Sequence, residues 1–301
     1  MGIENTIAAI AAAASATLSL AGAEEKAALW STTIDGQGYP RAAIATAEGG
    51  VVIVGNISTR SGLEDVWIVE VDRLGGVKWQ EVIGGSDNEY AHAIARTPQG
   101  GIAIAGDLPG KSRKDSQRGF VAHFSDGGKF LRTDYFPSAA GAVQLYDLAV
   151  GQDGGAFLTG RLLISDGGAK NSQTYVVRTD ANGKTLWERS FGGSGEERGA
   201  KLILDGEGVV VAAEVSETIG GNRSVLLLRI DENGDVIAEQ TITDSSSDVS
   251  ISELVRARDG GIFLLTSASR EPRPSLFERQ SKISRHFPAL FRLEASGAQV
   301  W

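Results

Sequence analysis

Acidic side chains gather in glycine- and serine-rich segments that lie between apolar runs. One such segment begins with Gly84-Gly85-Ser86 and another with Gly192-Gly193-Ser194. If brought together, their carboxylates could bind a cation or act as acid and base on a polysaccharide. They could equally cap the tight turns in which they lie, which is the interpretation that we favour. The candidate residues in these segments are Asp87, Glu89, Tyr90, Glu197, Arg198 and Asp248.

Two longer segments are basic against the acidic background of the chain. Residues 109–118 hold four basic side chains and one acidic one, and residues 270–286 hold five basic and two acidic. Arginine presents a fork of donors that matches carboxylate and phosphate oxygens. These segments therefore predict contacts with an anionic partner, such as a uronic acid, a phosphate or an acidic peptide, unless they are solvated loops without a ligand. The candidate contact residues are Arg113, Lys114, Arg273 and Arg279.

Other chemistries find no support in the sequence. Because the chain has no cysteine, it has no thiolate nucleophile, thiolate metal site or disulfide. Asp180 and Asp231 begin short acidic turns, but Ser190 and Gln240 stand where a calcium loop would place its bidentate glutamate. The three histidines are far apart in sequence and do not by themselves make a metal site. We therefore predict no catalytic residue, no metal and no cofactor.

Charge and composition limit the classes of partner. The chain has 301 residues, with 29 Lys and Arg against 38 Asp and Glu and a formal net charge of −9. That sign opposes the binding of nucleic acid or anionic lipid by the whole surface. Glycine occurs 39 times and proline only 7 times, which favours a β protein with many tight turns.

The elements that must position these side chains repeat along the chain. Five glycine-rich turns are each followed by an apolar run, and the last turn residue falls at positions 50, 101, 155, 208 and 261. A second apolar run in each period ends in an acid and leads through a glycine to a tryptophan or its equivalent, as in residues 175–187. Each period of about 53 residues is therefore expected to hold four short strands.

Four-stranded antiparallel units repeated at this spacing are typical of the blades of a β-propeller, because radial repetition protects most sheet edges. We predict an all-β, five-bladed β-propeller. The long connections, which carry the acidic and basic candidates, should lie at one end of the blades and the short turns at the other. A charged residue stands near the end of each third strand, where we expect an ion pair or hydrogen bond between blades: Glu70, His123, Arg178, Arg229 and Arg292.

The two ends of the chain predict how the ring closes. Residues 28–34 match the fourth strand of a blade but have no third strand before them, whereas the last period supplies a third strand and then ends at Trp301. Pairing of the N- and C-terminal strands in one blade would close the circle. A single propeller domain over residues 30–301 follows, in which Trp30 and Trp301 compete for one strand position.

The N-terminal segment has features of an export signal. Residues 7–23 are uncharged and end in Ala21-Gly22-Ala23, a small-x-small pattern typical of signal-peptidase sites, although the basic n-region is missing. We expect a signal peptide over residues 1–23, a leader over residues 24–29, and a periplasmic or secreted protein with no membrane span after cleavage. An alanine-rich helix or disordered leader and an uncleaved anchor are the alternatives.

Several stretches resemble a known class of repeat. Residues 175–187, the segment Phe191-Gly192-Gly193-Ser194 and the segment Asp259-Gly260-Gly261-Ile262 resemble the Asp-x-x-Gly-x-x-x-Trp propeller repeats of bacterial exported proteins. The resemblance covers about 270 residues and extends distantly to quinoprotein-like repeats. It implies a propeller fold and a role as a binding or interaction module. Quinone binding is put in doubt by the absence of a cysteine pair.

Together these patterns predict a non-enzymatic, exported binding module that recognises a glycan or a protein, including an anionic one, through its long-loop end. The alternative is a polysaccharide hydrolase or lyase in which Asp87, Glu89, Glu197 and Asp248 supply the acid and the base. A scaffold for an assembly partner is a third interpretation. Nucleic acid is not an expected partner.

Overall fold

The computed structural model of the protein describes residues 34, 38–59, 62–109, 117–166, 169–217, 222–242, 248–270 and 285–294. The predicted signal peptide and leader lie outside these ranges, and so do Trp30 and Trp301. The four candidate contact residues of the basic segments also lie outside them: Arg113, Lys114, Arg273 and Arg279.

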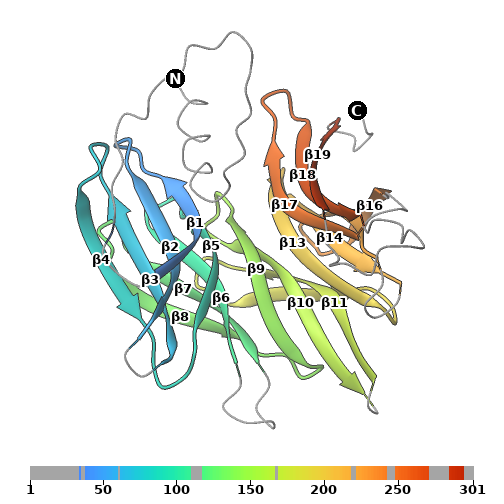
Figure 1. The fold of residues 1–301 in the computed structure, drawn as a ribbon, viewed down its shortest axis with the longest axis horizontal. Coiled ribbons are helices and arrows are strands. Elements are labelled where there is room, and N and C mark those ends of the chain that lie inside the picture. Colours follow the sequence, from blue (N-terminus) through green and yellow to red (C-terminus); the bar gives the residue numbers. More distant parts are fainter. Residues whose placement is uncertain are drawn as a thin grey trace, which may run out of the picture.

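The described chain consists of β-strands that pair in antiparallel meanders, in chain order (Figure 1). The first sheet contains β1 (Gly38–Ala45), β2 (Val51–Ser58), β3 (Glu64–Val71) and β4 (Val77–Ile83). The second contains β5 (Tyr90–Arg96), β6 (Ile102–Leu108), β7 (Arg118–Phe124) and β8 (Phe130–Phe136). The third contains β9 (Ala142–Val150), β10 (Ala156–Asp166), β11 (Ala169–Thr179) and β12 (Thr185–Phe191).

Two further sheets complete the described chain. The fourth contains β13 (Glu196–Asp205), β14 (Gly208–Ser216), β15 (Ser224–Ile230) and β16 (Val236–Ile242). The last contains β17 (Asp248–Arg256), β18 (Ile262–Arg270) and β19 (Arg285–Leu293). A single parallel bridge between Ser172 and Glu196 joins the third sheet to the fourth. The predicted all-β class and its four-stranded antiparallel sheets are confirmed.

Short hairpin turns join the strands at one end of each sheet. The turn between β3 and β4 places Gly75 at φ 90°, a left-handed conformation that glycine adopts without strain. Asp180, between β11 and β12, accepts hydrogen bonds from the backbone N–H groups of Asn182 and Lys184 at 2.9 Å each. Asp231 binds its own turn in the same way. These carboxylates therefore close hairpin turns rather than calcium loops, as predicted.

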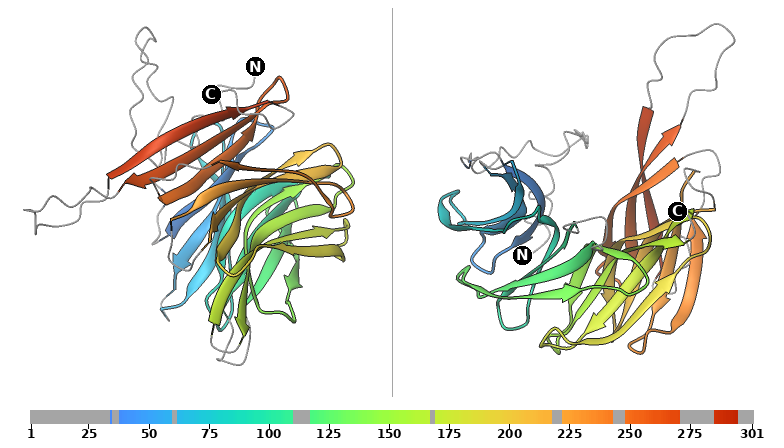
Figure 2. Two further views of the ribbon diagram at one scale, coloured as in Figure 1. Left: turned by 90° about the vertical axis from the view of Figure 1, so that its right-hand side faces the viewer. Right: turned by 90° about the horizontal axis from the view of Figure 1, so that it is seen from below.

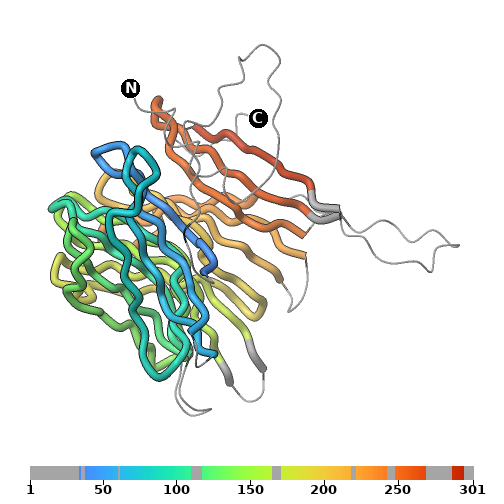
Figure 3. Tube along the Cα trace, turned by 60° about the vertical axis from the view of Figure 1, so that its left-hand side comes forward, coloured from blue at the N-terminus to red at the C-terminus, as the bar shows by residue number. Residues whose placement is uncertain are grey.

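Successive sheets are neighbours through their first strands. β1 contacts β5, β5 contacts β9, β9 contacts β13, and β13 contacts β17. The sheets follow one another along an arc, with β1–β4 at one end and β17–β19 at the other (Figures 2 and 3). The predicted closure of this arc into a ring depends on residues 28–33 and 295–301, which lie outside the described ranges.

Every first strand carries a β-bulge at the same place in the repeat. A bulge leaves one extra residue out of the pairing and re-aims its side chain. The extra residues are Arg41, His92, Tyr146, Ala200 and Ser252. In three sheets a glycine of the second strand lies against the bulge, because the carbonyl oxygen two residues before the extra residue leaves no room for a side chain: Gly55, Gly106 and Gly160.

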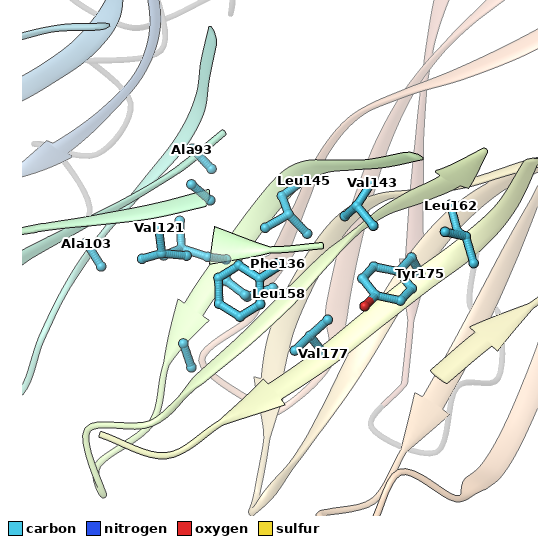
Figure 4. Packing of buried hydrophobic residues seen from close by; sticks show 13 residues of the cluster. Ala93, Ala103, Val121, Phe136, Val143, Leu145, Leu158, Leu162, Tyr175 and Val177 are labelled. Carbon is cyan, nitrogen blue, oxygen red and sulfur yellow. The ribbon is translucent and has the colours of Figure 1, made fainter. Parts of the chain in front are cut away.

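Apolar side chains fill the spaces between neighbouring sheets. Between the second and third sheets, Val121 and Phe136 pack with Leu145, Leu158 and Tyr175, all at most 5% exposed (Figure 4). Separate clusters fill the interfaces between the first and second, third and fourth, and fourth and last sheets. The alternation of apolar residues along each strand places one set on each face. Neighbouring sheets are therefore held face to face.

The repeated charged position of the third strands does not make the predicted contacts between sheets. Arg178 pairs with Asp153 at 2.5 Å within the third sheet, and Arg229 pairs with Asp205 at 2.8 Å within the fourth. Arg292 pairs with Asp259 within the last sheet. The reason is register, because the turn between the first and second strands carries the acid directly beside the third strand. The Arg178 and Arg292 pairs therefore lie within single sheets, whereas Asp205 also pairs with Arg256 on β17 at 2.8 Å and so joins the fourth sheet to the last.

Candidate functional site

Polar side chains interrupt the apolar second strands near the end that carries the long connections. Each directly follows the small residue that faces the bulge of the first strand. The residues at this position are Asn56, Asp107, Arg161 and Glu214. With side chains of the first strands and of the loop before β15, three of them form what we call the loop-end cluster: His92, Asp107, Tyr146, Arg161, Arg198, Glu214, Arg223 and Asp248.

The second sheet contributes a histidine held by a buried carboxylate. His92 is the bulge residue of β5, and its Nε2 lies 2.6 Å from Oδ1 of Asp107 on β6. The other carboxylate oxygen of Asp107 accepts a hydrogen bond from the Gln117 amide, and the side chain is only 2% exposed. The His92 ring meets the Tyr146 ring edge to face at a centroid distance of 5.3 Å. The Asp107 carboxylate therefore fixes the orientation of the His92 ring relative to the Tyr146 ring.

The third sheet supplies an aromatic ring and a guanidinium. Tyr146 is the bulge residue of β9, and its hydroxyl donates to Oε1 of Gln144 at 2.9 Å. Nε of Arg161 donates to the same oxygen at 2.5 Å. Among the described residues Arg161 has no ion pair, and the acceptor of its Nε is the oxygen of a neutral amide. Burial raises the pKa of Tyr146, against the opposing effect of Arg161 and Arg198, so the phenol stays protonated at neutral pH.

The fourth sheet buries a carboxylate between two arginines. The Glu214 side chain is 0% exposed and accepts two hydrogen bonds from Arg198, at 2.9 and 3.1 Å, and one from Arg223 at 2.9 Å. It also accepts the backbone N–H of Ile251, on the neighbouring β17, at 2.9 Å. Arg223 pairs in turn with Asp248 at 2.8 Å, and this hydrogen bonding lowers the pKa of Asp248. The network ties the fourth sheet to the last.

Arg198 links this ion network to the tyrosine. Its guanidinium carbon lies 5.6 Å from the centre of the Tyr146 ring. The side chains of Arg198, Arg223 and His92 are 37%, 33% and 24% exposed, so solvent reaches them. Residues of three successive sheets therefore meet around one aromatic ring with guanidinium groups beside it.

The two predicted loop glutamates cap their own turns. Oε2 of Glu89 accepts the Gly85 N–H at 3.3 Å, and Oε1 of Glu197 accepts the Gly193 N–H at 3.1 Å. Burial raises the pKa of both carboxyl groups. The nearby negative charge of Asp65 also raises the pKa of Glu89. The favoured capping interpretation therefore accounts for their positions.

The structure brings only part of the predicted site together. Arg198 joins the loop-end cluster, and Asp248 joins it through Arg223. Asp87 is half-buried in the loop between β4 and β5, and Tyr90 opens β5 two residues before His92. Sequence reasoning missed Asp107, Tyr146, Arg161, Glu214 and Arg223. The signal that could have found three of them is a charged residue at a fixed step inside an otherwise apolar run.

Two negative findings concern the part of the chain that the structure describes. It contains no group of three or more His, Asp or Glu side chains placed to hold a metal ion. It also contains no helix with the length and apolar character needed to cross a membrane.

A second polar contact joins the first strands of three sheets. Asp147, next to the bulge of β9, accepts the backbone N–H of Leu202 on β13 at 2.9 Å. Lys201 beside it lies 3.8 Å from Glu253 on β17. Burial raises the pKa of Asp147 to about 6, outweighing the attraction of Lys201. The folded state therefore binds more protons than the unfolded chain between pH 4 and pH 6.

We expect Asp147→Asn to change how stability depends on pH. Because the folded-state pKa is raised, ionisation of Asp147 destabilises the fold as pH rises from about 4 to about 6. The asparagine variant lacks this loss, so its stability relative to wild type should improve by about 2 kcal/mol between pH 4 and pH 7. Urea unfolding of both proteins at the two pH values measures the difference. Parallel pH profiles would contradict the burial of this carboxylate.

Comparison with known proteins identifies the fold but no family. No protein-family model matches the sequence, and no curated protein matches it. A Bacteroides caccae protein of unknown function is similar in structure, with a TM-score of 0.54 and 12% identity over 90% of this chain and 84% of that one. A mutant apocarotenoid oxygenase from Synechocystis has a TM-score of 0.51 and 14% identity over 86% of this chain.

These likenesses define the class of protein. The chain has a β-propeller-like all-β fold and is structurally similar to β-propeller proteins. It spans 59% of the length of the oxygenase and shares few of its residues, so the likeness concerns the fold alone.

Proposed function

We propose that this protein is an exported, non-catalytic binding module that recognises an acidic glycan through the loop-end cluster. The observation that carries the proposal is the pair of guanidinium groups beside one aromatic ring. Arg161 and Arg198 come from different sheets. The positive charge of each opposes the rise in the pKa of the Tyr146 phenol, and Arg198 lies beside the ring. Arg161 has no ion pair among the described residues, so its guanidinium can bind the carboxylate of a ligand without first leaving a carboxylate of the protein.

The chemistry of the cluster suits a sugar that carries a carboxylate. An aromatic ring offers a flat apolar surface, and a guanidinium binds a carboxylate with two parallel donors. Tyr146 and Gln144 add neutral hydrogen-bonding groups for hydroxyls. The basic segments 109–118 and 270–286 join second strands to third strands, so both leave the sheets at this same end. They would extend the cationic surface along a chain of acidic sugars.

The carboxyl groups favour binding over hydrolysis. Glu89 caps its own turn by accepting the Gly85 N–H. Glu197 caps a turn, and Asp248 is paired with Arg223. These groups have structural partners, whereas Arg161 lacks a charged one in the described chain. A binding module therefore explains the arrangement better than a hydrolase or lyase.

With this function we propose the closed five-bladed ring. The face of the first sheet that turns away from the second carries Trp67, Val69 and Val71, and Ile34 packs on it. In the fourth sheet the corresponding positions face the third sheet, and Phe191 packs there. Ile34 follows Trp30 by four residues, as Phe191 follows Trp187. This likeness of spacing supports our proposal that residues 28–34 are the fourth strand of a preceding blade.

The last sheet offers the matching face. Val255 and Leu290 are 46% and 48% exposed on the side that turns away from the fourth sheet. They stand at the repeat positions of Ala149 and Val176, which pack between the third and fourth sheets. In our proposal the last sheet takes residues 28–34 as its fourth strand and packs on the first sheet.

Binding of a uronic-acid oligosaccharide tests the function. We expect calorimetry to show that trigalacturonate binds wild type and that its methyl ester, which lacks the charges, binds at least tenfold more weakly. Arg161→Gln should weaken binding of the acid about tenfold or more, because a charge-assisted hydrogen bond contributes roughly 1.5–3 kcal/mol. Affinity should also fall as salt rises.

The matched control is Arg189→Gln on β12, which removes an exposed arginine far from the cluster in the repeat. It should bind like wild type. Equal affinity for the acid and its ester, or wild-type affinity in Arg161→Gln, would overturn the glycan proposal. Binding of an acidic peptide in place of the glycan would instead favour a protein partner. Simultaneous replacement of Arg113, Lys114, Arg273 and Arg279 by alanine measures what the two basic segments add.

A further inference from the structure

The interface between the second and third sheets lacks the tryptophan that its two neighbours have. On the fourth strand of the first sheet, Trp79 pairs with Glu70, and on that of the third sheet Trp187 pairs with Arg178. In the second sheet the same cross-strand position, opposite His123, holds Arg132. The fourth sheet has Ala238 at this position, opposite Arg229, so the second sheet differs from the first and third in carrying a charged side chain there.

The tryptophans fill the space beneath a turn of the following sheet. A Cβ atom on Gly128, in the β7–β8 turn, would lie 2.4 Å from the Trp79 indole, and one on Gly234 would lie 3.0 Å from the Trp187 indole. Trp187 also donates from Nε1 to the Glu232 carbonyl of that turn at 2.7 Å. Each indole thus closes one interface at the turn end of the sheets.

Arg132 reaches the equivalent turn but does not fill the space. Its Nη2 donates to the Ala181 carbonyl, between β11 and β12, at 3.3 Å. A cavity of about 270 Å³ remains between the second and third sheets. Its apolar wall includes Ile102, Phe124 and Ala156, which are at most 7% exposed. The narrow, flexible side chain of Arg132 therefore leaves a pocket that a tryptophan side chain would fill.

The polar wall of this cavity holds donors and acceptors in fixed positions. His123 Nε2 lies 2.8 Å from Oδ2 of Asp134, and Nε of Arg132 lies 3.2 Å from both oxygens of the same carboxylate. Burial, assisted by Arg132, lowers the pKa of His123, so the ring is neutral at pH 7. With Nε2 donating to the carboxylate, Nδ1 is an acceptor. Asp126 and Asp180 also line the cavity.

We propose that this cavity is a second binding site, separate from the loop-end cluster, for a neutral polyol the size of one monosaccharide. Hydroxyl groups need both donors and acceptors, which Arg132, His123 and Asp180 supply. The apolar wall suits the carbon face of a sugar ring. The lining carboxylates oppose an anion, so the ligand differs in charge from the one proposed for the loop end. The volume lies just below the usual range for drug-sized ligands, which fits a single ring.

Titration with single sugars tests this site. We expect galactose, glucose or xylose to bind wild type with a Kd on the order of 1 mM, measured by calorimetry and by shifts of backbone amide signals. The amide signals that move should belong to residues 97–103, 123–132 and 179–181. Arg132→Trp, which introduces the residue of the first and third sheets, should abolish the shifts. Arg132→Gln should weaken binding at least fivefold while keeping a donor for the Ala181 carbonyl.

The matched control is Arg189→Gln. Arg189 donates to the Asn233 carbonyl at 3.3 Å across the next interface, as Arg132 does to Ala181, but Trp187 closes the space there. This variant should bind sugars like wild type. Unchanged binding in Arg132→Trp, shifts confined to other residues, tighter binding of a charged sugar at these cavity residues, or no shift with any of the three sugars would each overturn the proposal. Arg161→Gln should leave this site intact, so the two proposals fail independently.

Discussion

Gly106→Ala is expected to destabilise the protein by about 3 kcal/mol or more. A Cβ atom at this position would lie 2.0 Å from the Tyr90 carbonyl oxygen and 2.7 Å from Cζ of Phe120. The first obstacle is backbone held by the bulge of β5, and the second is a ring that is only 3% exposed in the core between the first two sheets. Neither can move without breaking the pairing of β5 with β6.

Chemical denaturation monitored by circular dichroism measures this change. Gly127→Ala in the same sheet is the control, because no atom lies within 4 Å of its added Cβ and its φ is not in the left-handed region. The control should unfold within about 0.5 kcal/mol of wild type. If Gly106→Ala were equally mild, the close approach of the bulge to the second strand would be refuted.

Leu290→Asp is expected to destabilise the protein strongly, although its leucine is 48% exposed in the described structure. In the proposed ring this position packs on the first sheet, so aspartate would place an unpaired charge in an apolar interface. Such burial costs about 3 kcal/mol or more. Thermal unfolding should show a large fall in Tm.

Leu186→Asp on the outer strand β12 provides the comparison. Leu186 is 56% exposed and stays exposed whether or not the ring closes, so its variant should resemble wild type. Equal stability of the Leu290 and Leu186 variants would sink the closed ring but leave the loop-end cluster in place. A large loss for both would point to β-sheet propensity rather than closure.

Much of the fold could be predicted because its strongest signals are local. The glycine-rich turns fix where strands end, and Gly75 takes the left-handed conformation that such a turn requires. The continuous apolar runs of second and third strands such as β6 and β7 then place buried side chains on both faces of the sheet. The partners of Arg178, Arg229 and Arg292 could not be predicted in this way, because they depend on which turn lies beside the third strand.

The candidate site was harder to predict because it depends on bulges. An extra residue in a first strand changes which side chains face the loop end. The sequence does not reveal the bulge, because residues as different as Tyr146 and Ala200 occupy the bulge position. Arg161 and Glu214 come together with it only after three sheets are placed side by side. The sequence shows that Arg161 and Glu214 occupy the same position in their apolar runs. It does not show that this position lies beside the bulge, because that depends on how the strands pair.

The bulges have a consequence for how such a protein can diversify. Because the extra residue takes no part in strand pairing, its side chain can be exchanged without disturbing the ladder. The five positions already hold Arg41, His92, Tyr146, Ala200 and Ser252, which span cationic, aromatic and small side chains on an otherwise constant frame. Substitutions at these positions can therefore change the chemistry of the loop end one residue at a time while the strand pairing is kept.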